Sequence, residues 1–481
     1  MLKDGAGFAP AEIYELFGVQ RLVEPPPITL ALCCVAAPIA AQNIFRGQPS
    51  TADGYSTFDA DMIDIENVTR TGAGVYVAVL DTGLAPNWKD YFPEARVAAH
   101  LGKGFVQSLS FKAHKDSCGL GVTTGALRET TFIGSRGSEH GTHVTSTILG
   151  FFYRSNFDAA SGFEIPPIMV RGIAPNVTII PVRVLADYQI PQLPKCTDPE
   201  ISKESQVAVF GTSEMIAAGI DYVTDLAMAG YRPMVINMSL GGGVLDPVEQ
   251  VAIDRAIANG VIIVASAGNS GDAGMGYPGA YAPVISVAAA GWNNSWVDPG
   301  VTLFPYRMFW LQNGSDFSPP LFANGGAVTE PTPTASGFFN NAAYIADFSS
   351  RELAGQQLDV TAPGVWIRGP FAGFPGYNHL PWWSQGVGDL LGGNSGNFFY
   401  VSGTSMAAPH TAAVAALMLE KNAALTQAQV ESILKSTALP IPPGSGGDFR
   451  ITGGFADMQV WGANATGSGL IQADAAVAAT P

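Results

Sequence analysis

The sequence predicts an α/β fold with a doubly wound, mainly parallel sheet and helices on both faces. Short apolar runs typical of buried strands recur at residues 75–80, 235–238 and 261–265. Stretches with the pattern of helices alternate with them, at residues 214–227, 246–258 and 407–420. Because parallel strands are joined by helical crossovers that cover the sheet, this alternation favours a parallel sheet.

The first of these strands runs into an acidic residue. Residues 75–80 are mostly apolar and lead directly into Asp81, Thr82 and Gly83. Ligands of open α/β sheets bind at the carboxyl ends of the strands, which makes Asp81 a candidate site carboxylate. An aspartate at this point is equally typical of a helix cap or an Asx-turn, and the segment alone leaves both interpretations open.

Two histidines follow in SEHGTHVTSTILG, where residues 140–150 are predicted to form a helix. His140 and His143 are three positions apart and share one face, a spacing that could hold a metal ion. The segment has no HExxH pattern and no third His or Cys ligand, which disfavours zinc. We therefore expect His143 to be a packed, hydrogen-bonded core histidine and His140 to be available as a base.

The string GTSMAAPH, residues 403–410, presents Ser405 where a glycine-entered turn leads into a helix. A serine hydroxyl is a weak nucleophile unless a histidine base removes its proton and a carboxylate orients that base. His140 and Asp81 are the candidates for these two roles. A further polar residue, Asn269, ends the strand pattern VIIVASAGN; in isolation this ending would be interpreted as a turn.

The motifs DTG, HGTH and GTSMAAP, in this order, resemble the active-site motifs of the subtilisin-like (subtilase) serine proteases. Matching pieces cover most of residues 75–479. The resemblance implies the subtilisin-like form of the α/β fold. It also implies that Asp81, His140 and Ser405 form a catalytic triad, and that Asn269 donates to the oxyanion of the tetrahedral intermediate beside the Ser405 amide.

The resemblance also implies a substrate-binding site. In the family, the segment that matches Ser239, Leu240 and Gly241 pairs with the extended substrate chain and forms one wall of the primary pocket. The alternative is a tight turn into the next helix. Gly268 and Gly276 match positions that line this pocket, and their small size implies a preference for large apolar or aromatic side chains before the scissile bond.

The implied activity is that of a serine endopeptidase that acts on proteins or peptides and needs no cofactor for its chemistry. Two alternatives remain open: a serine esterase, and a catalytically silent peptide-binding or surface protein on the same fold. An esterase would be expected to carry a GxSxG motif, whereas Ser405 lies in GTSMA. A silent protein would be expected to have lost a triad residue.

The metal content is left open by the sequence. Asp90, nine positions after Asp81, matches a calcium-ligand position of some subtilases, so structural calcium is one expectation. The other loop ligands do not align. A solvated surface carboxylate explains Asp90 equally well.

The charge balance argues against nucleic-acid binding. The chain of 481 residues has 24 Lys and Arg against 40 Asp and Glu, a formal net charge of −16. So few basic groups give little affinity for phosphates. The acidity is also explained by solubility alone.

The chain is divided into an N-terminal segment, residues 1–60, and a catalytic domain with loop insertions, residues 61–481. The uncharged run at residues 28–41 has the length of a signal-peptide core and is too short for a membrane span, so we expect a secreted protein. The acidic residues Asp4, Glu15 and Glu24 precede it, which is atypical of a signal peptide. We recognise no inhibitory prodomain.

The insertions are expected to be packed surface loops, with lids over the cleft as the alternative. They span about residues 98–137, 187–206, 291–343 and 366–397. Cys118 and Cys196 fall in the first two, and we expect them to form a disulfide in an oxidising compartment.

Overall fold

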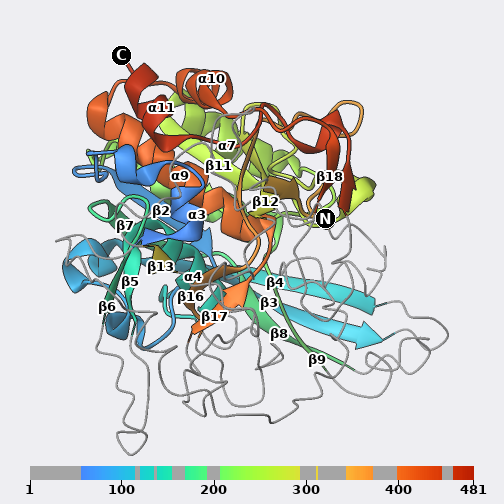
Figure 1. Cartoon of the computed structure of the whole chain (residues 1–481). Helices are drawn as coiled ribbons and strands as arrows, with labels where there is room; N and C mark the ends of the chain where they lie inside the picture. The colour runs from blue at the N-terminus through green and yellow to red at the C-terminus, as the bar shows by residue number, and fades with distance from the viewer. Residues whose placement is uncertain are drawn as a thin grey trace, which may run out of the picture.

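The computed structural model describes residues 56–113, 120–134, 138–153, 168–191, 206–292, 310–311, 343–371, 398–446 and 459–481 (Figure 1). Its helices are α3 (Phe58–Asp61), α4 (Ser138–Leu149), α6 (Ser213–Met228), α7 (Pro247–Ala258), α9 (Thr404–Lys421), α10 (Gln427–Thr437) and α11 (Ala473–Ala479). Its longer strands are β2 (Tyr76–Asp81), β3 (Lys103–Ala113), β4 (Leu120–Thr130), β7 (Thr178–Arg183), β8 (Ala186–Ile190), β9 (Gln206–Phe210), β10 (Met234–Met238), β11 (Val261–Ser266) and β12 (Ile285–Trp292). The shorter strands are β1 (Ser56–Thr57), β5 (Gly150–Tyr153), β6 (Ile168–Arg171), β13 (Trp310–Leu311), β14 (Ala343–Ile345), β15 (Val360–Pro363), β16 (Ile367–Pro370), β17 (Phe398–Val401), β18 (Gly444–Gly446) and β19 (Gln459–Trp461).

The central sheet has the order β14-β12-β11-β10-β2-β7-β3-β4, with β15 beside β12. The pairs from β12 through β11, β10, β2 and β7 to β3 are parallel, and only the edge strands β14 and β4 run antiparallel to their neighbours. In the middle, Val77 of β2 lies opposite Val235 of β10 and Ile179 of β7. The predicted doubly wound, mainly parallel sheet is confirmed.

Alternate residues of each central strand contact different helices, which places helices on both faces. In β2, Val77 and Val79 belong to the core shared with α4 and α9, whereas Ala78 and Leu80 belong to the core shared with α6 and α7. The same alternation continues in the neighbouring strands, where Val235 faces the first core and Ile236 the second. This period of two is expected for strands buried on both faces.

The helices begin where the sequence offers a cap. The Thr212 hydroxyl accepts from the Met215 N–H at the start of α6, and the Asp246 carboxylate accepts from the Val248 N–H at the start of α7. Thr426 and Gln429 form a capping box on α10. The predicted helices at residues 214–227, 246–258 and 407–420 are confirmed, with α9 starting three residues earlier than expected.

Two of the predicted insertions form β-hairpins, whereas the last two, residues 291–343 and 366–397, lie mostly outside the described residues, so packed loops or lids there stay a prediction. In the first, β3 and β4 form a long antiparallel hairpin, and in the second β8 and β9 form another. Figure 1 shows the two hairpins extending together from the body. They pack through aromatic rings: the centroids of Tyr188 and Phe210 lie 4.6 Å apart, and Phe111 lies 6.0 Å from each of them. Tyr188 also donates to the Gln107 carbonyl.

The segment before β2 packs against the catalytic body. Met62, Ile63 and Ile65 are almost completely buried and belong to the core that includes α9. At Asp59, within α3, a carboxylate contacts His410 of α9. The boundary predicted at residue 60 therefore falls within a helix that packs on the body; the division into two domains stays a prediction.

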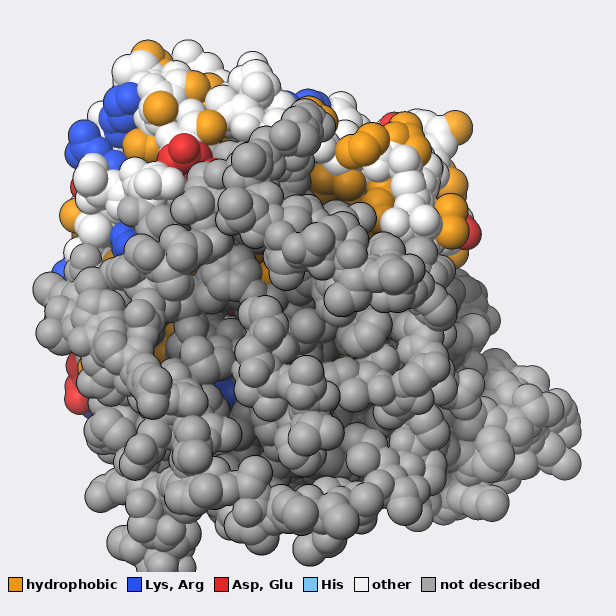
Figure 2. Space-filling model, viewed as in Figure 1, with side chains coloured by type: hydrophobic (Ala, Val, Ile, Leu, Met, Phe, Trp, Pro, Cys, Tyr) orange, Lys and Arg blue, Asp and Glu red, His pale blue; other side chains and the backbone are white. Residues whose placement is uncertain are grey.

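On the described part of the face drawn in Figure 2, apolar side chains lie among white uncharged and backbone atoms, and several Lys and Arg side chains gather at the upper left. None of the described helices has the length and hydropathy needed to cross a membrane.

Candidate active site

Asp81 lies at the carboxyl end of β2, between β10 and β7, and its side chain is fully buried. Its Oδ1 accepts hydrogen bonds from the Thr82 N–H at 2.6 Å and from His140 Nδ1 at 2.8 Å. The interpretation of Asp81 as a local cap is incomplete, because it also binds a histidine 59 residues further along the chain.

His140 is the third residue of α4 and is 2% exposed. Because a carboxylate only accepts, the bond to Asp81 places the proton on Nδ1 and leaves the lone pair on Nε2. Nε2 is buried and has no hydrogen-bond partner among the described residues. The imidazole is thus held in the tautomer that accepts a proton at Nε2.

A glycine lets α4 approach β2 closely enough for this contact. A Cβ at Gly141 would lie 2.3 Å from the Gly83 carbonyl oxygen and 3.1 Å from Asp81 Oδ1. The Gly141 N–H donates to Thr82 Oγ1 at 2.9 Å, which ties the start of the helix to the turn after β2. The DTG and HGTH motifs are therefore in direct contact.

His143 has the structural role predicted for it. Its ring is fully buried, and Nε2 lies 3.1 Å from the Ile367 carbonyl oxygen. His143 and His140 do not share a ligand. Within the described part of the chain, no three His, Cys, Asp or Glu side chains are placed to bind one metal ion. Asp90 is an exposed residue of the 3₁₀ turn Trp88–Asp90.

Ser405 is the second residue of α9 and is 3% exposed. Its hydroxyl donates to the Ser239 carbonyl at 3.2 Å, and the Ser239 hydroxyl donates to the Ser405 carbonyl at 2.7 Å. α4 packs against α9, which brings His140 and Ser405 to one side of the sheet. The structure contains the Asp81–His140 hydrogen bond but no hydrogen bond between His140 and Ser405.

The start of α9 leaves one amide without an acceptor. The Thr404 N–H donates to Asn269 Oδ1 at 2.9 Å, and the Met406 N–H donates to the Gly403 carbonyl at 3.0 Å. Among the described residues, the Ser405 N–H between them has no acceptor. Free amides and the positive end of the dipole make a helix N-terminus favourable for an anion.

Asn269 follows β11 and is oriented by Thr404. Asn269 Oδ1 accepts from both the N–H and the hydroxyl of Thr404, each at 2.9 Å. Because the amide oxygen is used in this way, the Nδ2 group is the part of Asn269 that remains to donate. The sequence did not predict this role of Thr404. Its position next to Ser405 was the available indication, because the contact with Asn269 joins residues 135 positions apart.

The five predicted substrate-binding residues fall into two groups: two with buried side chains and three glycines that lie close together. The side chains of Ser239 and Leu240 are buried, the first against Ser405 and the second in the core with α6 and α7. Only backbone groups of these two residues can therefore reach a substrate. Gly241, Gly268 and Gly276 converge: a Cβ at Gly276 would lie 3.8 Å from the Gly241 carbonyl carbon, and one at Gly268 would lie 3.2 Å from the Gly276 nitrogen.

Gly268 has a φ of 103°, which favours glycine. Beside it, Gly242 and Tyr277 exchange two backbone hydrogen bonds of 2.7 Å, which join the segment after β10 to the segment of Gly276. These glycine-rich segments form a backbone surface next to Asn269.

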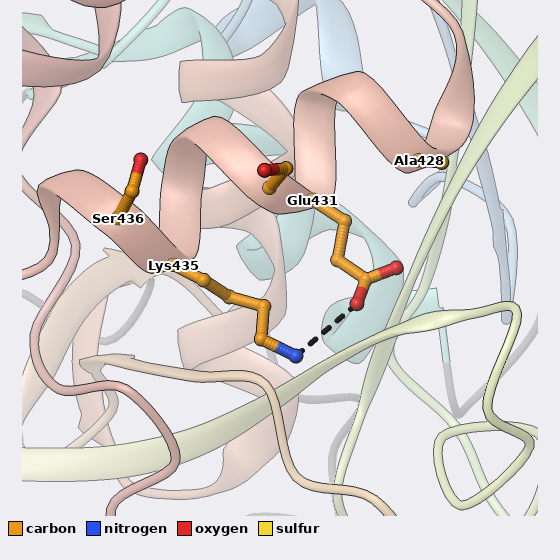
Figure 3. A pocket seen from close by; sticks show the side chains of 5 residues that line it. Ala428, Glu431, Lys435 and Ser436 are labelled. Atoms are coloured by element: carbon orange, nitrogen blue, oxygen red, sulfur yellow. Dashed lines mark hydrogen bonds and ion pairs between the residues drawn. The ribbon is translucent and has the colours of Figure 1, made fainter.

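A separate depression of about 500 Å³ lies on α10 and contains none of the predicted site residues (Figure 3). It is lined by Ala428, Glu431, Ser432, Lys435 and Ser436. Lys435 Nζ lies 3.2 Å from Glu431 and 2.9 Å from the buried carboxylate of Asp359. Burial raises the pKa of Glu431, as does nearby Asp359. The depression is open, and its charged groups are engaged with one another.

Comparison with known proteins identifies the family. The model of the subtilase family (Peptidase S8) matches residues 72–465. Subtilisin DY of Bacillus licheniformis is 27% identical over 389 residues, 80% of this chain and 90% of that protein. A subtilisin of Bacillus pumilus is 28% identical over 372 residues, 76% of this chain and 85% of that protein. Among solved structures, the S41 psychrophilic protease is 23% identical with a TM-score of 0.48, over 88% of this chain and 99% of that one. Because the family match spans most of the sequence, the protein belongs to the subtilase family and is a serine-type endopeptidase.

Proposed function

We propose that the protein hydrolyses peptide bonds within protein chains, with Ser405 as nucleophile, His140 as general base and Asp81 as the carboxylate that orients His140. One observation carries the proposal: His140 Nδ1 is hydrogen-bonded to buried Asp81 at 2.8 Å, while its buried Nε2 has no partner in the described part of the chain. A base in this tautomer, on a helix packed against the helix of Ser405, is arranged to remove the serine proton.

In the first half of the reaction, the Ser405 hydroxyl turns from the Ser239 carbonyl to His140 Nε2. His140 takes the proton as the serine oxygen attacks the peptide carbonyl carbon, forming a tetrahedral intermediate with a negatively charged oxygen. The C–N bond then breaks, and His140 gives its proton to the leaving amine. The product is an acyl-enzyme on Ser405.

In the second half, water repeats the attack. His140 removes a proton from water, the hydroxide attacks the acyl carbon, and collapse of the second intermediate returns the proton to Ser405 and releases the acid. Both steps use the same base and consume no cofactor.

The oxyanion of both intermediates binds Asn269 Nδ2 and the Ser405 N–H. Two contacts support this: Thr404 holds the Asn269 oxygen away from the site, and the Ser405 amide is the one near the start of α9 without an acceptor among the described residues. Donors fixed before the reaction stabilise charge without reorganisation.

The substrate lies as an added strand along the backbone of the segment Ser239, Leu240 and Gly241, and its side chain before the scissile bond enters a pocket at Gly268 and Gly276. The absence of Cβ atoms at the glycines supports a preference for large apolar or aromatic residues. Cleavage of a peptide library with equal amounts of each residue tests this; a strong preference for basic residues would refute it.

We also propose that the protein is secreted. The support is the uncharged run at residues 28–41, which lies outside the described residues. Structural calcium remains a proposal, with Asp90 as the only suggested ligand.

The test of the proposed activity is casein hydrolysis by the purified protein beside a Ser405→Ala variant, with the N-terminus of each mapped by mass. Ser436→Ala, on the exposed face of α10, is the matched control. We expect activity in the wild type and the control and none above background in Ser405→Ala. Hydrolysis by Ser405→Ala at the wild-type rate would refute the proposal.

A further inference from the structure

The helix of Ser405 contains a proline that removes one of its own hydrogen bonds. Pro409 has no N–H, so the Ser405 carbonyl, four residues earlier, lacks its helical donor. The Ser239 hydroxyl donates to that carbonyl instead, at 2.7 Å. The first turn of α9 is therefore held in position partly by side chains that lie outside this helix.

His410, next to this proline, supplies a second such contact. It is fully buried, with Nδ1 2.8 Å from the Met406 carbonyl oxygen and Nε2 3.0 Å from a carboxylate oxygen of Asp59. His410 therefore links the Met406 carbonyl of α9 to the carboxyl group of Asp59 through two buried hydrogen bonds.

Asp59 comes from a distant part of the sequence, 351 residues before His410, and is 6% exposed. It lies on α3, just before the buried residues Met62 and Ile63 that fix this segment to the core. Removing one partner of a buried hydrogen bond is costly, because the other polar group is left unsatisfied.

The contact is directed at the residue after Ser405. His410 connects Asp59 to the Met406 carbonyl. Met406 directly follows Ser405, whose hydroxyl and carbonyl both form hydrogen bonds with Ser239. A shift of the first turn of α9 would therefore move the Ser405 oxygen relative to His140.

We propose that Asp59 is a positioning residue for the reaction: through His410 it fixes the first turn of α9 and the nucleophile on it. The inference rests on the proposed function of Ser405. If Asp59 has this role, the segment before β2 contributes to the geometry of the active site.

The same helix provides a matched control at its other end. Glu420 Oε2 accepts from the N–H groups of Thr71 and Gly72, each at 2.7 Å, and so also ties the chain before β2 to α9. It lies fifteen residues beyond Ser405. A Glu420→Gln variant weakens a contact between α9 and the segment before β2, as Asp59→Ala does, but leaves the first turn of α9 unchanged.

The test compares kcat and KM on a chromogenic peptide with the melting temperature of each variant. For Asp59→Ala we expect kcat to fall by about ten- to a hundredfold, the range for a small misplacement of reacting groups, with KM unchanged. Asp59→Glu, which keeps a carboxyl group, should recover part of kcat. Glu420→Gln should melt at a lower temperature with full kcat.

A double variant, Asp59→Val with His410→Leu, keeps the test valid if Asp59→Ala fails to fold, because it replaces both buried polar partners together and leaves neither unsatisfied. We expect it to regain the melting temperature but keep the low kcat. A kcat that recovers with the melting temperature would overturn the inference and leave only a structural role.

Labelling with a fluorophosphonate separates the two proposals. If the wild type is not labelled at Ser405, the proposed function fails. If the wild type and the double variant are labelled at Ser405 at equal rates, only the role of Asp59 fails.

Discussion

Asn269 accepts two hydrogen bonds from Thr404, one from the backbone N–H and one from the hydroxyl, each 2.9 Å long. Thr404 Oγ1 in turn accepts from the Gly268 N–H at 3.2 Å. The residue before the proposed nucleophile therefore orients the proposed oxyanion donor, and it links the segment after β11 to the start of α9.

Replacing Asn269 should lower turnover more than substrate binding. For Asn269→Ala we expect kcat to fall by about a hundred- to a thousandfold, the range known from subtilisin, with little change in KM. Asn269→Asp is the sharper variant, because it keeps an oxygen for Thr404 but has no N–H₂ to donate. Steady-state kinetics in which Asn269→Asp retains wild-type kcat would rule out the amide as an oxyanion donor.

A methyl group at Gly141 should separate the two motifs that hold the base. The Cβ of Gly141→Ala would meet the Gly83 carbonyl oxygen at 2.3 Å, so α4 must move away from β2. We expect kcat to fall at least about tenfold and the melting temperature to drop, because the Asp81–His140 bond lengthens.

Gly230→Ala is not a suitable control, since its φ of 106° is itself strained for alanine. Ala258→Gly, at the end of α7, destabilises a helix without touching the site and is the better comparison. Wild-type kcat in a folded Gly141→Ala protein would show that this close contact is not needed.

Glu249 should make stability depend on pH near neutrality. Glu249 is 4% exposed, and its Oε1 has no partner within the segments that the structure describes. Burial, with a further contribution from Asp246, raises its pKa from 4.5 to about 7. The folded protein therefore keeps a proton that the unfolded chain loses. Stability should fall as the pH rises from about 4.5 to 7 and then level off, by up to about 3 kcal/mol in total.

The variant Glu249→Gln should abolish this fall, because glutamine cannot lose the proton. The measurement is urea unfolding at pH 5 and pH 8 in a Ser405→Ala background that avoids self-digestion. Glu214→Gln, exposed on α6, is the control and should keep the wild-type slope. An unchanged slope in Glu249→Gln would mean that Glu249 does not titrate in this range.

Cys118 and Cys196 lie outside the described residues, and their disulfide remains a prediction. The hairpins whose connections contain them, β3–β4 and β8–β9, pack on one another. We expect the alkylated mass of the unfolded protein to increase on prior reduction by the equivalent of two added alkyl groups at these cysteines. An unchanged number of free thiols would exclude the disulfide.

Local patterns were enough to predict the central sheet and the polar residues at its edge. The apolar runs of β2, β10 and β11 are continuous because both of their faces are buried, and Asp81 and Asn269 mark their ends. The contact of Asp81 with His140 was expected from the resemblance of the DTG and HGTH motifs to those of the subtilases.

The remaining features depend on contacts between residues distant in the sequence. The hairpins of the insertions are stabilised by rings such as Phe111 and Tyr188, whose pairing needs both insertions together. No sequence pattern around Asp59 predicts its contact with His410, 351 residues away. The burial of Glu249 likewise depends on how the tertiary structure packs around it. From the sequence alone, an Asp or Glu side chain is predicted to lie on the surface, because these residues are mostly exposed in proteins.

The most direct test of the account is the site of covalent labelling. The wild type and a His140→Ala variant are treated with a fluorophosphonate and digested, and the modified peptide is sequenced by mass spectrometry. We predict one adduct per molecule, on Ser405, in the wild type, and slow or no labelling in His140→Ala. An adduct on another residue, or equal labelling of Ser405 without His140, would contradict the proposed triad.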